Sequence, residues 1–87
     1  MRKVWSDDAW EDYLYWQSQD KKTLKKINSL IKDIDRNGYQ CKGKPEQLTG
    51  NLVGFWSVHI DSKNRIVFRI TDDSIEIAQC RTHYGDK

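Results

Sequence analysis

The sequence contains no apolar run near the roughly 20 residues that cross a membrane, and no apolar segment of a secretory signal peptide. Its only two cysteines, Cys41 and Cys80, lie far apart, as is typical of reduced thiols in a protein without an export signal. The sequence also lacks the nucleophile elbow, the phosphate-binding loop and the dinucleotide fingerprint. We therefore expect a cytoplasmic protein with no membrane segment and with none of these common chemistries.

A zinc site needs separate consideration, because two Cys and two His are present. Cys80 and His83 form one Cys-x-x-His pair, whereas Cys41 and His59 have no close-spaced partner. Structural zinc sites usually take their ligands in such pairs. We therefore expect neither a metal nor another cofactor, and a zinc-binding module stays as an alternative that stoichiometric zinc in the purified protein would reveal.

The pattern of apolar residues predicts a single α+β domain of the order β-α-α-β-β-β. Ser6 and Asp20 are typical helix N-caps, and Asn37-Gly38 is a typical helix end. Short turns between the last three strands favour an antiparallel sheet, with the two helices packed on one side. The four tryptophans fall at core-like spacing. The predicted helices are 7–19 and 21–37, and the predicted strands are 2–5, 55–60, 65–70 and 74–81.

Positive charge is concentrated in residues 21–44, where eight basic against two acidic side chains give a net charge of +6. The preceding residues 1–20 carry two basic and five acidic groups, a net charge of −3. A basic block on one helix and its following loop is a plausible contact surface for a polyanion, although a solvated helix face is the more common explanation. The basic residues of interest are Lys21, Lys22, Lys25, Lys26 and Lys44.

An acid–base set remains as the source of chemistry. Glu46 follows a Gly-Lys-Pro turn, Arg65 opens a strand, and His83-Tyr84 stand at the chain end. A carboxylate can accept the proton of an RNA 2′-hydroxyl. An arginine can neutralise the charge of the phosphorane-like, pentacoordinate transition state through two hydrogen bonds. A histidine can bind that phosphate or donate a proton to the leaving oxygen. Each of these residues alone is more often a solvated or terminal side chain.

Several segments of the sequence form one pattern, namely Val4-Trp5-Ser6, Trp10–Trp16, Lys25–Asn28, Gly43–Glu46, Gly54–Ser57, Asn64–Val67 and His83-Tyr84. Taken together, they closely resemble YoeB toxins of the RelE superfamily, across residues 1–84 without an evident gap.

The resemblance implies a RelE-like fold and a toxin that cleaves mRNA in the ribosomal A site without a metal. Glu46 then corresponds to the general base, Arg65 to the phosphate-stabilising arginine, His83 to the terminal catalytic histidine and Tyr84 to the tyrosine beside the scissile phosphate. Expected partners are the ribosome with its mRNA and a YefM-like antitoxin whose tail blocks the site. With the antitoxin, such toxins commonly bind operator DNA and repress their own operon, and the free toxin can form a homodimer.

Three departures from the family pattern bear on activity. Val58 and His59 stand where basic side chains are familiar, and Thr49 stands where a lysine is familiar. His59 can replace part of that charge for RNA binding, but a histidine is mostly uncharged at neutral pH. The third departure is that the chain continues past Tyr84, where the family usually stops, so the toxin domain spans 1–84 and 85–87 form a short C-terminal extension. The alternative to an enzyme is a non-catalytic RNA-binding module or a corepressor that works only through its antitoxin.

The basic helix face generates a testable prediction. If Lys21, Lys22, Lys25 and Lys26 contact ribosomal RNA phosphates, replacing all four with Gln should weaken ribosome binding and leave the fold intact. The affinity of the unchanged protein should also fall steeply with salt, because bound phosphates release counterions. The measurement is ribosome binding across a salt series. Equal binding by both proteins at every salt concentration would show that these lysines form only a solvated face.

Overall fold

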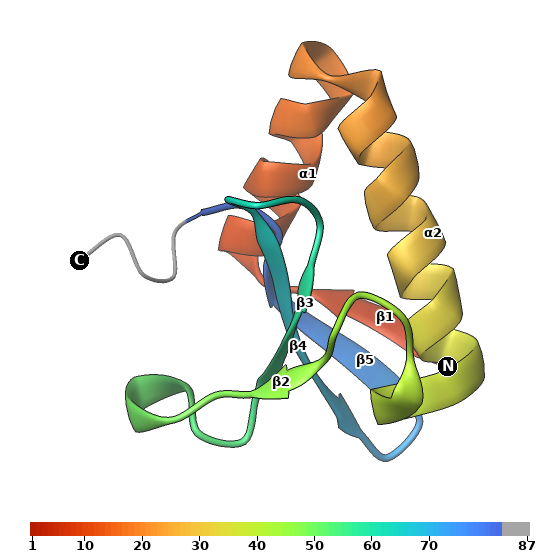
Figure 1. Cartoon of the computed structure of the whole chain (residues 1–87), viewed down its shortest axis with the longest axis vertical. Helices are drawn as coiled ribbons and strands as arrows, with labels where there is room; N and C mark the ends of the chain where they lie inside the picture. The colour runs from red at the N-terminus through yellow and green to blue at the C-terminus, as the bar shows by residue number, and fades with distance from the viewer. Residues whose placement is uncertain (83–87) are drawn as a thin grey trace.

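Two helices cover one face of a five-stranded sheet in the computed structural model, which describes residues 1–82 (Figure 1). The α+β class and the packing of both helices on one side are therefore as predicted. Short 3-10 turns lie at Gly38–Gln40 and Gly50–Leu52. The regular elements are β1 (Arg2–Trp5), α1 (Asp7–Gln19), α2 (Lys21–Asn37), β2 (Glu46–Gln47), β3 (Trp56–His59), β4 (Arg65–Thr71) and β5 (Ser74–Gln79).

The helix boundaries follow from the predicted caps. The Ser6 hydroxyl accepts the Ala9 N–H at 3.0 Å, and the Asp20 carboxylate accepts the N–H groups of Lys22 and Thr23. These bonds satisfy amide donors that the first turn of a helix leaves without intrahelical partners. Hydrogen bonds from Thr23, first from its side chain, hold the pKa of Asp20 below its ordinary value. Helix α2 ends at Asn37 and is capped by Gly38, whose φ of 61° lies in the region that favours glycine.

The core lies between the helices and the sheet. Alternate positions of the strands point toward the helices, because successive side chains of a strand project to opposite faces. Of the four tryptophans, Trp16 is buried and Trp5 and Trp56 pack against the core, but Trp10 is 47% exposed and corrects the prediction that all four are core residues. The fully buried core side chains include Ile27, Ile34, Val58, Ile66, Phe68, Ile75, Ile77 and Cys80.

The sheet order is β1-β5-β4-β3-β2, and the sheet is mixed. Strands β2 to β5 pair antiparallel with their neighbours, whereas β1 pairs parallel with β5. The predicted fully antiparallel sheet is therefore wrong at β1. Both helices and three strands separate β1 from β5 along the chain, so no hairpin turn constrains their direction. The two-residue strand β2 was also not predicted, because it lies in a segment with turn residues and no apolar alternation.

Helix α1 holds the end of β5. The backbone N–H of Cys80 donates to the buried Asp12 carboxylate at 3.0 Å, and the Cys80 carbonyl accepts the Trp16 indole N–H at 2.8 Å. Two residues before Cys80, the Ala78 carbonyl accepts a hydrogen bond of 2.8 Å from the Ser6 hydroxyl. A register shift between Val67 and Phe68 of β4 makes room for Ala78 as an extra residue in β5. These side chains therefore satisfy backbone groups where the regular ladder ends.

This junction makes Trp16 important beyond its packing. Replacing Trp16 with Phe should lower the free energy of unfolding by roughly 1–3 kcal/mol, because the buried Cys80 carbonyl loses its donor. The matched control is Trp10→Phe, which changes an exposed tryptophan in the same helix and should cost less than about 0.5 kcal/mol. Urea denaturation followed by circular dichroism measures both. Equal stability of the two variants would show that the indole hydrogen bond contributes nothing.

Candidate active site

One row of residues crosses four strands on the face of the sheet that the helices do not cover. Glu46 of β2 lies opposite Ser57 of β3, Ser57 lies opposite Val67 of β4, and Val67 lies opposite Gln79 of β5. Directly opposed residues of an antiparallel pair project to the same face. The neighbours of this row along the chain, Val58 and Ile66 among them, face the helical core.

Arg65 lies in the next row, directly opposite His59. Adjacent strands are about 4.8 Å apart, so β2 and β4 are separated by roughly 10 Å across the sheet. Arg65 is two positions along β4 from Val67, the residue of β4 in the row of Glu46. The carboxylate and the guanidinium can therefore approach one small group, such as a phosphodiester, from two sides. The structure thus brings Glu46 and Arg65 to one face of the sheet.

The turn before β4 determines where Arg65 begins. The Asp61 carboxylate accepts the backbone N–H groups of Lys63 and Asn64 at 2.8 and 2.7 Å, and the Asn64 side chain also donates to it. Burial raises the pKa of Asp61, but the N–H groups of Asn64 outweigh it and hold that pKa below its ordinary value. Arg65 Nη1 makes two contacts of 3.4 Å, to the carbonyls of Asp61 and Asn64. These long contacts leave the guanidinium free to take a stronger partner.

The segment before Glu46 is held against β3 by backbone contacts. The Gly43 carbonyl accepts the His59 N–H at 2.8 Å, and both Gly43 and Lys44 have positive φ, of 92° and 57°. A Cβ atom at Gly43 would lie 3.1 Å from the Val58 Cβ and 3.2 Å from a Leu30 methyl. Only glycine therefore fits there without strain. This close approach places Lys44 and His59, both predicted RNA-binding residues, beside the row that contains Glu46.

Three buried polar atoms around this row have no hydrogen-bond partner among residues 1–82. They are the Ser57 hydroxyl, Arg65 Nε and Gln79 Oε1. Such atoms are rare in folded proteins, because water in the unfolded chain satisfies them and the fold does not. Sequence reasoning missed Ser57 and Gln79. A serine and a glutamine in alternating strands carry no signal of their own, and only the bulge at Ala78 turns Gln79 to this face.

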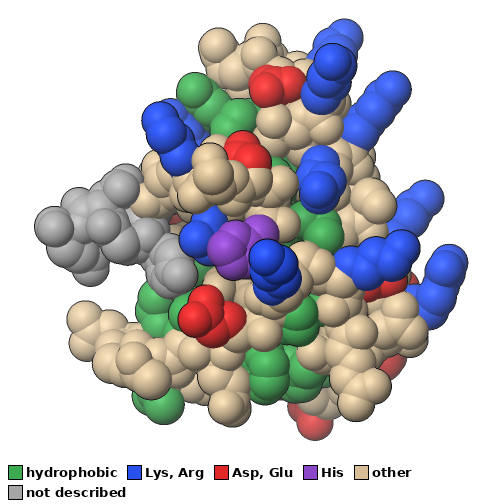
Figure 2. Space-filling model, in the orientation of Figure 1, with side chains coloured by type: hydrophobic (Ala, Val, Ile, Leu, Met, Phe, Trp, Pro, Cys, Tyr) green, Lys and Arg blue, Asp and Glu red, His purple; other side chains and the backbone are tan. Residues whose placement is uncertain are grey.

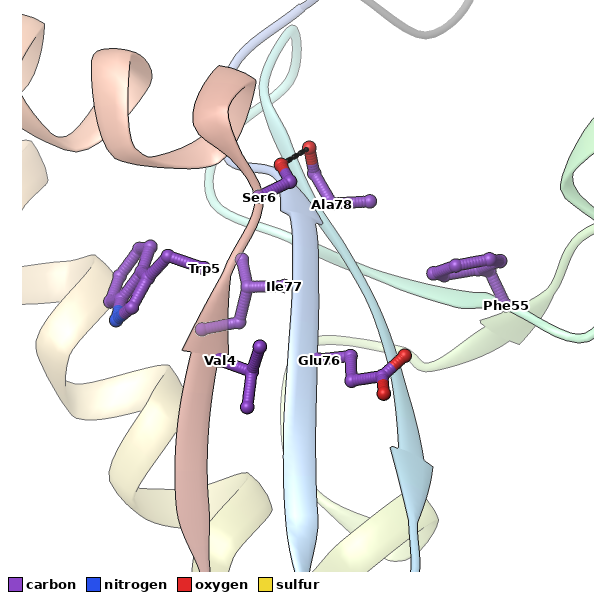
Figure 3. Close-up of a pocket in the computed structure, with 7 residues that line it drawn as sticks. All are labelled: Val4, Trp5, Ser6, Phe55, Glu76, Ile77 and Ala78. Carbon is purple, nitrogen blue, oxygen red and sulfur yellow. Dashed lines mark hydrogen bonds between the residues drawn. The ribbon is translucent and has the colours of Figure 1, made fainter.

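An apolar groove of about 300 Å³ continues the same face toward β1. Val4, Glu76 and Ala78 extend from adjacent strands, and Phe55 approaches from the segment before β3 (Figure 3). The guanidinium of Arg69 lies 4.7 Å from the Phe55 ring centroid, and its Nε donates to Glu76 at 2.6 Å. The hydrogen bond from Arg69 lowers the pKa of Glu76. The ion pair therefore supports the aromatic wall of the groove.

The four predicted RNA-binding lysines of α2 lie away from this face. Lys21, Lys22, Lys25 and Lys26 are all exposed, on a helix that covers the opposite face of the sheet. Basic side chains gather along the α2 flank of the molecule (Figure 2). The structure thus separates a basic flank from the row with Glu46.

His83 and Tyr84 lie outside the described residues, so their assignment as catalytic residues stays a prediction. The described chain leads toward them from the α1 junction. Arg81 stacks on Tyr15 of α1, with its guanidinium carbon 3.5 Å from the ring centroid. The route of the chain just before His83 is therefore defined by contacts with α1.

Cys80 lies in the core. Burial raises the pKa of its thiol to about 12, and the nearby Asp12 carboxylate adds to the shift. Within residues 1–82, no three His, Cys, Asp or Glu side chains lie close enough together to hold a metal ion. No helix in the same range is long and apolar enough to cross a membrane.

Comparison with known proteins identifies the family. Residues 5–84 match the family model described as the YoeB-like toxin of bacterial type II toxin–antitoxin systems. The chain belongs to this family. It is 55% identical to Toxin YoeB of Escherichia coli strain K12 over 84 residues, which cover 97% of this chain and all of that protein. The resemblance stated from the sequence is thereby confirmed, and with it the RelE-like fold.

Solved structures of YoeB proteins have the same fold. In the YoeB–YefM complex from Staphylococcus aureus, the matched chain is 46% identical with a TM-score of 0.89, covering 97% of this chain and 98% of that one. A structure of the YoeB dimer from the same organism is 47% identical with a TM-score of 0.88 and the same coverage. The protein is therefore similar over nearly its whole length to toxins solved both with an antitoxin and as a dimer.

The fit of Gly43 against β3 can be tested by substitution. Gly43→Ala should lower the free energy of unfolding by more than about 2 kcal/mol, because it combines a strained φ with the crowding against Val58 and Leu30. The control is Gly50→Ala, where φ is 65° but no atom lies within 4 Å of the added Cβ. It should cost only about 1 kcal/mol for the backbone conformation. If urea denaturation gives the two variants equal stability, the close approach of Gly43 is not a constraint.

Proposed function

We propose that this protein is the toxin of a type II toxin–antitoxin pair, an endoribonuclease that cleaves mRNA in the ribosomal A site and so inhibits translation. In the proposed reaction Glu46 takes the proton of the 2′-hydroxyl, whose oxygen then attacks the adjacent phosphorus. The bond from phosphorus to the 5′-oxygen breaks, and that oxygen receives a proton. The products are a 2′,3′-cyclic phosphate and a 5′-hydroxyl, and the reaction requires no metal.

The observation that carries this proposal is the presence of Glu46 and Arg65 on one uncovered face of the sheet. An in-line displacement needs a base on one side of the phosphate and positive charge on its equatorial oxygens. Arg65 can supply two parallel hydrogen bonds to those oxygens. We assign His83 as the group that donates a proton to the 5′-oxygen or stabilises its charge, and Tyr84 as a contact to the scissile phosphate.

The two departures at Val58 and His59 differ in consequence. Val58 is fully buried on the helical side of the sheet, so it does not face the proposed RNA site. His59 lies directly opposite Arg65 and is partly exposed. We propose that His59 and Lys44 contact RNA beside Arg65.

The proposed partners follow from the family. The Staphylococcus aureus relative is solved as a YoeB–YefM complex and as a YoeB dimer. We propose a YefM-like antitoxin that covers the face with Glu46 and Arg65, operator DNA bound through that antitoxin, and a homodimer of the free toxin. The site of action is the cytoplasm, where the ribosome and its mRNA lie, and the exposed α2 lysines suit ribosomal RNA.

The separate roles proposed for Arg65 and Glu46 give a kinetic prediction. Arg65→Ala should lower single-turnover cleavage on programmed ribosomes by roughly a hundred- to a thousand-fold, because one aimed donor to the transition state is lost. Ribosome affinity, measured separately, should change much less. Arg65→Lys should rescue only partly, since an ammonium keeps the charge but loses the planar two-point contact. Glu46→Gln should also slow cleavage, because an amide cannot accept the 2′-hydroxyl proton.

The same experiment separates an enzyme from a binding module. If unchanged protein binds ribosomes and represses through its antitoxin but leaves mRNA intact, the protein is a non-catalytic module. If Arg65→Ala cleaves at the unchanged rate once bound, Arg65 serves docking alone and the proposed mechanism is wrong at that position. Losses from Glu46→Gln and Arg65→Ala need not add, because residues that act on one transition state rarely do.

A further inference from the structure

On the uncovered face, the buried polar atoms that have no partner within the described part of the chain are two donors and one acceptor. The Ser57 hydroxyl can donate a hydrogen bond, Arg65 Nε can donate one, and Gln79 Oε1 can accept one. Ser57 is fully buried, although it lies one strand away from the exposed Glu46. Buried polar atoms without partners destabilise a fold. Their grouping around one row therefore points to a state of the protein in which they do have partners.

The partner within reach of Ser57 is Glu46. The two residues are directly opposed on β2 and β3. Side chains in such pairs begin about 5 Å apart, and a glutamate is long enough to bring a carboxylate oxygen to a serine hydroxyl in that position. A hydroxyl that donates a hydrogen bond to a carboxylate favours the charged form of the carboxylate and limits the rotation of the carboxylate group. Ser57 is thus placed to orient Glu46 as a base.

The partner within reach of Gln79 is Arg65. Gln79 of β5 lies opposite Val67 of β4, and Arg65 lies two residues before Val67 on β4. Gln79 and Arg65 are therefore diagonal neighbours across the two strands. Such neighbours lie about 7–8 Å apart, within reach of two long side chains. The terminal nitrogen of Arg65 holds only two contacts of 3.4 Å. A phosphate would draw that end of the guanidinium away and leave Nε to be oriented by an acceptor.

We propose that Ser57 and Gln79 are positioning residues of the active site. When an RNA phosphate binds the terminal nitrogens of Arg65, Ser57 donates to the carboxylate of Glu46 and Gln79 Oε1 accepts the Nε–H of Arg65. Both groups act through another residue and do not touch the reacting atoms. This inference rests on the proposed function, since it concerns the base and the phosphate ligand of that reaction.

The proposal has a signature that an ordinary structural role would not produce. Ser57→Ala and Gln79→Met each remove a buried polar atom that lacks a partner in the free protein. Each should therefore leave the urea midpoint unchanged or raise it, because no hydrogen bond of the free fold is lost. Each should nevertheless lower single-turnover cleavage about ten-fold or more, the range expected for losing a hydrogen bond to a charged group.

The experiment measures urea unfolding and single-turnover cleavage on programmed ribosomes for both variants. Gln79→Glu keeps an acceptor and should restore cleavage, and Gln47→Met is the matched control, because Gln47 is an exposed glutamine of β2 outside the row. In Ser57→Ala the acidic limb of the pH–rate profile should move to higher pH, since the carboxylate loses a donor that favours its charged form. Cleavage at the unchanged rate, or a loss that matches a loss of stability, would overturn the proposal.

Failure of the proposed function would be separately visible. If the unchanged protein cleaves no mRNA, the Nε–H of Arg65 is followed by nuclear magnetic resonance during titration with inorganic phosphate. Slower exchange of that proton in the unchanged protein, lost in Gln79→Met and kept in Gln47→Met, supports the pairing of Gln79 with Arg65. The same exchange rate in all three proteins would overturn it.

Discussion

The rest of the structure depends on the hydrogen bonds that join α1 to the end of β5. Asp12 and Trp16 lie one helical turn apart and satisfy the N–H and the carbonyl of the same residue, Cys80. The two groups are buried, so water cannot replace either partner. Because β5 pairs with both β1 and β4, this contact also sets the position of the helices over the whole sheet.

The same contact links packing to the proposed chemistry. The bulge at Ala78 lets β5 keep Ile77 and Cys80 in the core while Gln79 turns to the uncovered face. If side chains alternated strictly from Ile77 onward, Gln79 would face the core and Cys80 would face away from it. The bulge therefore serves two surfaces at once, a dry one against α1 and a polar one beside Arg65.

The two faces of the sheet differ in polarity and in how completely their polar atoms are paired. The helical face buries aliphatic side chains with few polar atoms, and it supplies most of the stability of an 87-residue chain. The uncovered face has Glu46 and Arg65 without an ion pair to each other within the described residues, together with three unpartnered buried atoms. An arrangement that favours a ligand over the free fold is expected where a transition state must be bound.

The sequence by itself determined the elements whose cause is local. The Ser6 and Asp20 caps, the end of α2 at Gly38, and the apolar spacing of Ile27 and Ile34 act within one or two helical turns. Glu46 and Arg65 were also identified from the sequence, by their match to a family pattern and by the chemistry that a carboxylate and an arginine can perform on a phosphate. His83 was identified in the same two ways, and Tyr84 by the family match.

Only the tertiary structure decided the features that depend on distant partners. The parallel pairing of β1 with β5, the short strand β2, and the exposure of Trp10 each result from packing between segments far apart in the chain. Ser57 and Gln79 belong to the same class, because neither residue type signals a role until strand register places it beside Glu46 or Arg65. Propensity and capping energies are local quantities, whereas register and burial are properties of the assembled sheet, and no local pattern contains them.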